Sequence, residues 1–130
     1  MATYTSDPEP AVMSVVLHEA AHNLGPAHQY KVGDKIDRDQ FGGPLASTLE
    51  ELKAQTAALY FTDWLVEKKK IEAPMANQAH LRDLLWAFGH ISRGMYDENK
   101  HPKNYSQLAA IQFGALVRGG AVEWKKDVDP

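Results

Sequence analysis

The sequence predicts a mainly α-helical domain of about four helices, because apolar residues recur at helical spacing along most of the chain. Pro- and Gly-rich connections separate the helical segments, and no alternating apolar and polar stretch is long enough to indicate a sheet. The 130 residues, 44% of them hydrophobic, are enough for one hydrophobic core. We therefore expect residues 1–130 to form a single helical domain.

The first helix is predicted to run from Pro10 to Leu24, where Gly25 and Pro26 stop it. Its apolar residues lie on nearly all sides, which predicts a buried central helix. A polar loop of about 20 residues follows, and loops of that length without periodicity tend to be functional.

Three further helices follow this loop. The second is predicted to begin with Ser47 as its N-cap and Glu50 as the capping-box partner, and to continue through LEELKAQTAALYFTDWLVEKKK. The third runs from Asn77 to about Asn99 and the fourth from Tyr105 to Val117, each with a core face of apolar residues. After the fourth helix the stretch AVEW, residues 121–124, is a candidate short terminal strand.

Composition excludes several classes of function. The net charge of -3 and the pI near 6.0, without a basic stripe, argue against nucleic acid or a membrane as a partner. The chain has no long apolar run, and its start lacks the features of a secretory signal, so the expected location is cytoplasmic. Because cysteine is absent, a zinc site must use His, Asp and Glu, which favours a catalytic over a structural site.

The segment VVLHEAAHNLG contains an HExxH motif formed by His18, Glu19 and His22. An α-helix rises about 1.5 Å and turns about 100° per residue, so the two histidines lie one turn apart and can bind one ion. Glu19 is about a quarter-turn away, where its carboxylate can accept a proton from a metal-bound water. The motif therefore predicts a catalytic zinc site.

Two candidates compete to be the third ligand that such a site needs. His28 completes the metzincin pattern in HEAAHNLGPAH, which also requires a methionine turn that Met75 or Met95 would supply only outside a helix. Glu51 is the alternative, as a ligand from the second helix with the hydrogen-bonding residue Gln55 four positions later on the same face.

The alternative to a metal site is that the HExxH pentapeptide occurs by chance. Under it, His18 and His22 are ordinary polar residues, but a mostly apolar helix would then bury two histidines without partners. The glutamate motif on the second helix argues against that interpretation. We expect His80, His90 and His101 to be ordinary surface or core residues.

The stretches HEAAHNLGP and LEELKAQTAALYFTDWLV together resemble the metallopeptidase core of the dipeptidyl peptidase III family, in particular its shorter bacterial and Nudix-associated relatives. These proteins pair an HExxH or HExxxH helix with an EExxA(D/E) helix, and the resemblance continues more faintly through WAFGHISRGM and YSQLAAIQFGALV. It implies that His18, His22 and Glu51 bind zinc and that Glu19 is the general base.

The chain departs from the family pattern at two positions. Gln55 stands where the family has an acidic residue that orients a metal-binding histidine, and an amide brings no negative charge. The family also uses a histidine near the start of a late helix to stabilise the transition state. The closest position here is Tyr105, with His101 four residues earlier, and a tyrosine can donate a hydrogen bond to an oxyanion.

The resemblance implies zinc-dependent hydrolysis of peptide substrates. It also implies that the chain is a piece of a longer, two-lobed peptidase, since the match covers only the region around the metal helices. The alternative from another class is a metal-binding or self-associating helical domain without peptidase activity, in which a second copy covers the exposed core face and the protein is a homo-oligomer.

Overall fold

The computed structural model describes residues 4–25, 31–36, 39, 43–123 and 125. Within these residues the fold is mainly α-helical, as predicted. The helices are α1 (Glu9–Ala21), α3 (Ala46–Glu67), α4 (Ala73–Ile91) and α5 (Asn104–Arg118). A two-stranded antiparallel hairpin, β1 (Lys31–Val32) and β2 (Lys35–Ile36), and the 3-10 helix η1 (Gly43–Leu45) lie between α1 and α3.

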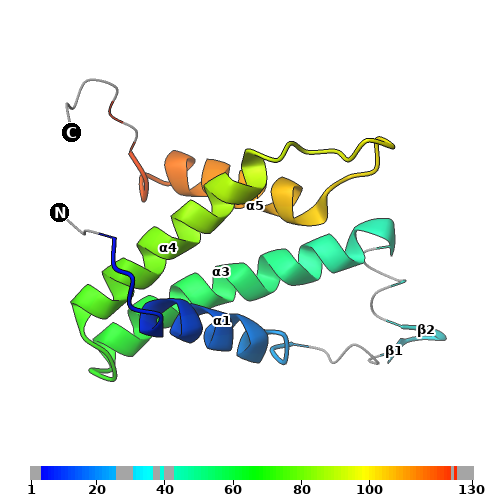
Figure 1. Ribbon diagram of the computed structural model, residues 1–130. Helices are drawn as coiled ribbons and strands as arrows, with labels where there is room; N and C mark the ends of the chain where they lie inside the picture. Colours follow the sequence, from blue (N-terminus) through cyan, green and yellow to red (C-terminus); the bar gives the residue numbers. More distant parts are fainter. Residues whose placement is uncertain (1–3, 26–30, 37–38, 40–42, 124, 126–130) are drawn as a thin grey trace.

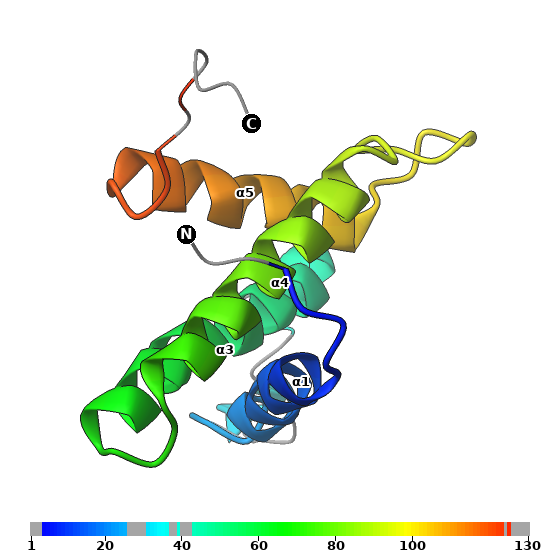
Figure 2. The ribbon, with the colours of Figure 1, turned by 60° about the vertical axis from the view of Figure 1, so that its left-hand side comes forward.

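The helices are arranged around α3 (Figure 1). The HExxH helix α1 packs mainly against α3 and also against α4, whereas α5 packs against α4 and α3. Figure 2, in which α1 is seen nearly end-on, shows α5 running across α4. The predicted packing of the HExxH helix against the glutamate-bearing helix is therefore confirmed.

Small side chains fill the centre of the domain. Ala54 and Ala79 are 0% exposed, Ala58 is 1% exposed, and Leu108 is the largest fully buried side chain of the described residues. Alanine at a helix contact allows the two backbones to approach closely, because no long side chain separates them. This close approach places polar side chains of α1 within reach of those on α3.

The prediction that the first helix is buried on all sides is wrong. Val12, Val15 and Val16 are 57–58% exposed, because α3 and α4 cover only part of the α1 surface. The helix also ends at Ala21 rather than at Leu24, so that His22 occupies its C-cap position.

The predicted capping box at the start of the second helix is also wrong. The helix α3 begins at Ala46 with Leu45 as its N-cap and has no side-chain cap. Ser47 therefore lies inside the helix, and its hydroxyl accepts a hydrogen bond from Asn104 Nδ2 at 3.4 Å. Glu50 is left available for another partner.

The third helix is shifted toward the N-terminus relative to the prediction, because α4 already begins at Ala73 and ends at Ile91. Gly94 adopts a φ of +79°, a conformation that favours glycine and ends helices. The loop after it is closed by an isolated bridge between Tyr96 and Pro102. Met95 consequently lies in a loop, whereas Met75 lies in the first turn of α4.

Strands occur at a different place from the predicted one. The hairpin lies in the segment that was expected to be a plain polar loop, with Gly33 at a φ of +65° in its turn. Residues 121–123 form no strand; the amides of Ala121 and Val122 instead donate to the Leu116 carbonyl and close the end of α5. Trp124, the last residue of the predicted strand, lies outside the described residues. No described helix has the length and apolar character that crossing a bilayer requires.

Candidate metal centre

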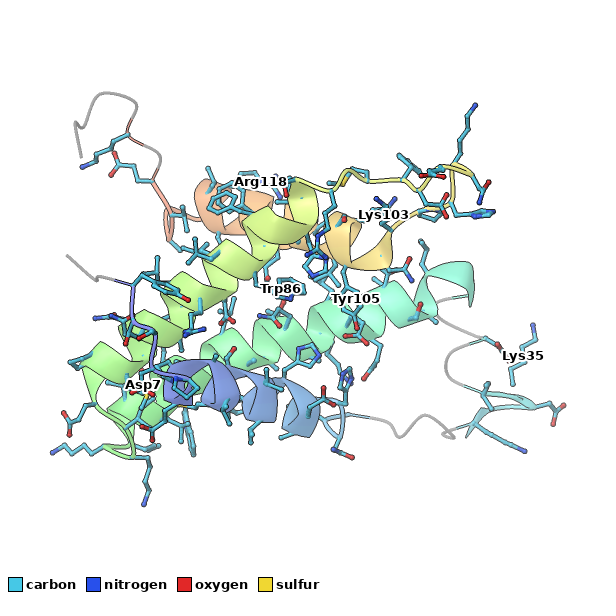
Figure 3. The ribbon with its side chains drawn as sticks, in the orientation of Figure 1. Asp7, Lys35, Trp86, Lys103, Tyr105 and Arg118 are labelled. Carbon is cyan, nitrogen blue, oxygen red and sulfur yellow. The ribbon has the colours of Figure 1, made fainter. Side chains whose placement is uncertain are left out.

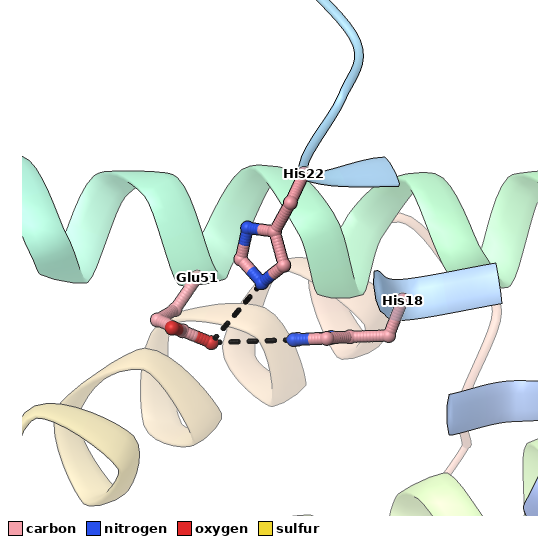
Figure 4. Close-up of side chains that lie close together, drawn as sticks. All are labelled: His18, His22 and Glu51. Carbon is pink, nitrogen blue, oxygen red and sulfur yellow. Dashed lines mark ion pairs between the residues drawn. The ribbon is translucent and has the colours of Figure 1, made fainter. Parts of the chain in front are cut away.

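The structure brings His18, His22 and Glu51 together where α1 faces α3. One ligand atom from each lies within 4.8 Å of the other two. Glu51 Oε2 is 3.2 Å from His18 Nε2 and 3.9 Å from His22 Nε2, and Figure 4 shows both imidazoles pointing at this carboxylate. Two nitrogen donors and one oxygen donor of this kind could hold a divalent cation.

The remaining nitrogen of each imidazole interacts with a side chain of α3. His18 Nδ1 lies 3.0 Å from Gln55 Oε1, and His22 Nδ1 lies 3.0 Å from Glu50 Oε1. Since amide and carboxylate oxygens only accept hydrogen bonds, both Nδ1 atoms are the donors. Each Nε2 lone pair is then free to bind a metal, which is the arrangement that metal-binding histidines usually adopt.

Glu50 therefore orients His22 instead of capping a helix. Lys53 Nζ lies 2.7 Å from the same Glu50 oxygen. Burial by itself raises the pKa of Glu50, but the hydrogen bonds from Lys53 and His22 outweigh burial and lower it overall. The carboxylate thus stays ionised where it faces His22.

The environment of Glu51 fits a cation. Its Oε2 atom is buried and accepts no hydrogen bond, although a buried carboxylate oxygen without a partner is costly. The side chains of the three residues are 18–25% exposed, so the group is partly shielded from water but still reachable. A divalent ion between Glu51 and the two Nε2 atoms would supply the missing partner.

A cavity of about 400 Å³ lies beside this group. Its lining includes His18, Glu19, Asp83, Trp86, His90 and Tyr105. Trp86 from α4 and Tyr105 from α5 extend toward α3 in Figure 3, and their ring centroids are 6.0 Å apart. Glu19, the predicted general base, is exposed and is part of the cavity wall.

Tyr105 lies in the first turn of α5 and approaches Glu51. Burial raises the pKa of the Tyr105 phenol, and the charge of Glu51 and the hydrogen bond to it raise the pKa further. The hydroxyl is therefore protonated at neutral pH and can donate a hydrogen bond. His101, the other residue considered for this role, is instead 74% exposed in its side chain and pairs with Asp97 at 3.3 Å.

The remaining histidines that the structure describes are not part of the His18, His22 and Glu51 group. His28, the competing third ligand, lies outside the described residues. His80 interacts with Asp63 at 2.9 Å. His90 is part of the cavity wall, with its ring centroid 4.4 Å from that of Trp86, and burial and the charge of Arg93 lower its pKa.

Sequence reasoning missed the role of Glu50, although its spacing contained a signal. His18 and His22 lie one turn apart on α1, so their hydrogen-bond partners on α3 must be separated by a similar distance. Glu50 and Gln55 are separated by about 7.5 Å along α3, which approximates the separation of about 6 Å between the two histidines on α1.

Searches with the chain find no matching family model, no matching curated protein and no matching solved structure. The chemistry of the site is therefore inferred from the residues themselves.

Proposed function

We propose that the protein is a zinc-dependent peptidase whose metal ligands are His18, His22 and Glu51. The observation that carries the proposal is the convergence of these donors within 4.8 Å beside a cavity whose wall includes His18 and Glu19. Two histidines and one glutamate are a ligand set of catalytic zinc sites, which leave one position for water. The absence of cysteine favours this interpretation over a structural site.

A zinc ion bound there would lower the pKa of a water molecule and polarise a substrate carbonyl. Glu19 accepts the proton from the attacking water, for which its exposed position on the cavity wall leaves room. The same carboxyl group then passes the proton to the leaving amine. Tyr105 donates a hydrogen bond to the carbonyl oxygen as negative charge develops on it.

A peptide is the substrate that this cavity suits best. Its wall combines the aromatic rings of Trp86, His90 and Tyr105 with the polar groups of α1, and such mixed walls hold a partly apolar chain in a defined orientation. The resemblance of the two motif helices to the dipeptidyl peptidase III family supports this assignment. It also supports a longer peptidase of which these residues form the metal-binding part.

Zinc content tests the ligand assignment. The parent protein should bind one zinc ion per chain, Glu51→Ala should lose it, and His28→Ala should keep it, as measured by atomic absorption after equilibrium dialysis. Loss of zinc from His28→Ala with retention in Glu51→Ala would replace this proposal by the metzincin alternative.

Substitution of the general base tests the reaction. Glu19→Gln should abolish cleavage of dipeptidyl-naphthylamides, because the amide cannot accept the proton from water, while one zinc ion per chain remains bound. Undiminished turnover by Glu19→Gln would contradict the role of Glu19.

The alternative function is that of a metal-binding or self-associating helical domain without peptidase activity. One observation favours it: apolar side chains of α1, among them Val12 and Val16, are more than half exposed. A parent protein that binds zinc, associates and cleaves no peptide would support this alternative.

A further inference from the structure

The two histidines of the candidate metal centre are oriented by groups of different charge. His22 Nδ1 donates to the Glu50 carboxylate, and Lys53 approaches the same oxygen. His18 Nδ1 donates to the amide oxygen of Gln55, which carries no charge. An amide is also ambiguous, because it can present either its oxygen or its nitrogen to the imidazole.

A third helix supplies a carboxylate behind this amide. Asp83 lies on α4, and its Oδ1 atom accepts a hydrogen bond from Ser14 Oγ at 2.7 Å. Asp83 Oδ2 is buried and has no hydrogen-bond partner at ordinary distance. Burial raises the pKa of Asp83 overall. Several interactions oppose this rise: the hydrogen bond from Ser14, hydrogen bonding from the Gln55 amide, and the charges of His80 and His18.

His18, Gln55 and Asp83 line the same cavity, so the Asp83 carboxylate is placed to select which end of the Gln55 amide faces His18. The Gln55 nitrogen carries only donors and is attracted to Asp83, so the Gln55 oxygen turns to His18. His18 must then carry its proton on Nδ1, and the lone pair of Nε2 is directed at Glu51 and the metal position. The reversed amide would leave the proton on Nε2, where it blocks metal binding.

We propose that Asp83 is a positioning residue of the metal centre, which fixes the orientation of Gln55 and thereby the tautomer of His18. The inference rests on the proposed zinc site and adds to it a residue from α4. This role explains why a carboxylate, Asp83, occupies a buried position. An asparagine there would avoid the cost of desolvating a charge. Ser14, one turn before His18 on α1, holds the carboxylate in place.

The first test is the zinc affinity of Asp83→Asn, measured by competition with a chromophoric chelator. The substitution keeps the shape and an acceptor for Ser14 but removes the charge. We expect zinc affinity to fall by about 10-fold, at the lower end of the effect of substituting a residue that supports a metal ligand. Asp97→Asn is the matched control, because Asp97 also pairs with a histidine, His101, but on the exposed loop between α4 and α5, and it should leave the affinity unchanged.

A second substitution separates positioning from a merely structural role. Gln55→Glu places a carboxylate directly beside His18 and should restore zinc affinity in the Asp83→Asn background. In the parent background it should not raise affinity, because two carboxylates would then face each other. The effects of the two substitutions are therefore expected to be strongly non-additive. Weak binding by Asp83→Asn that Gln55→Glu does not repair would overturn the proposal.

A third measurement needs no metal. Glu51→Ala serves as the background, because it removes the carboxylate that competes for a proton on His18 Nε2. Nitrogen-15 NMR of this metal-free variant should show His18 protonated on Nδ1, and a mixture of tautomers once Asp83→Asn is added. Circular dichroism and thermal melting establish that the variant is folded; if it is not, Ser14→Ala, which removes the donor holding Asp83, should produce the same mixture. An unchanged His18 tautomer in the folded variant would contradict the proposal.

These measurements distinguish two kinds of failure. A parent protein that binds no zinc overturns the proposed function, while the tautomer of His18 still decides whether Asp83 positions it. A parent that binds zinc, with an Asp83→Asn variant that binds equally well and keeps the same tautomer, overturns only the role of Asp83.

Discussion

Tyr105 approaches the candidate metal centre from α5, opposite α1, which carries the proposed general base Glu19. Burial and Glu51 raise the pKa of its phenol, so the hydroxyl remains a hydrogen-bond donor at neutral pH. In the proposed reaction Glu19 would act on the water and Tyr105 on the substrate oxygen.

Replacement of Tyr105 by Phe removes this donor with little change of shape. We expect kcat to fall by about 100- to 1,000-fold, the usual cost of losing one oxyanion donor, with KM and zinc content nearly unchanged. Steady-state kinetics on a dipeptidyl-naphthylamide, with zinc analysis of the same sample, would measure this. A variant with parental kcat would exclude Tyr105 from the reaction.

At the scale of the helices, the site depends on how closely α1 and α3 pack. Ala54 is completely buried and lies one turn after Glu50 and Glu51 on α3, so it shares their face. The short side chain allows His18 and His22 to reach α3. A larger residue at this position would push the helices apart.

Ala54→Leu should therefore lower the free energy of unfolding by about 1–3 kcal/mol, the usual cost of overpacking a core, and should weaken zinc binding. Urea denaturation of the metal-free protein and chelator competition measure the two effects. Ala115→Leu is the matched control, because Ala115 is exposed on α5 and the same change there should alter neither quantity. Tight zinc binding by Ala54→Leu would contradict the importance of this spacing.

At the scale of the whole molecule, the domain buries few large apolar side chains. Its buried hydrophobic residues within the described chain are alanines and Leu108. Several large apolar residues are exposed instead, among them Val12 and Val16 on the outer face of α1 and Leu49 and Tyr60 on α3. Large contiguous apolar patches on a protein surface often mark association sites.

We therefore expect the chain to self-associate in a concentration-dependent way, as measured by sedimentation velocity. Val12→Glu combined with Val16→Glu should shift the protein toward the monomer, since burying these charges in an interface is costly. Ile111→Glu, on the exposed side of α5, should have a smaller effect. A parent protein that remains monomeric at high concentration would contradict this expectation.

Several features of the fold and of the candidate site could be predicted from the sequence. Apolar periodicity predicted the helices, and the spacing of His18 and His22 predicted that both side chains would face one point. The helix ends were less predictable: α4 ends at Ile91, three residues before Gly94 adopts a positive φ, and α3 begins without the expected Ser47 cap. Such ends depend on contacts with other elements as much as on local sequence.

The sequence by itself determined the helical class, the pairing of the two histidines and the choice of donor atoms, because these follow from local periodicity and from residue chemistry. Only the tertiary structure decided that Glu50 orients His22, that Asp83 stands behind Gln55, and that α1 exposes its valines. Those outcomes depend on which faces of α1, α3 and α4 meet, and residues far apart in the chain become neighbours only when the helices pack.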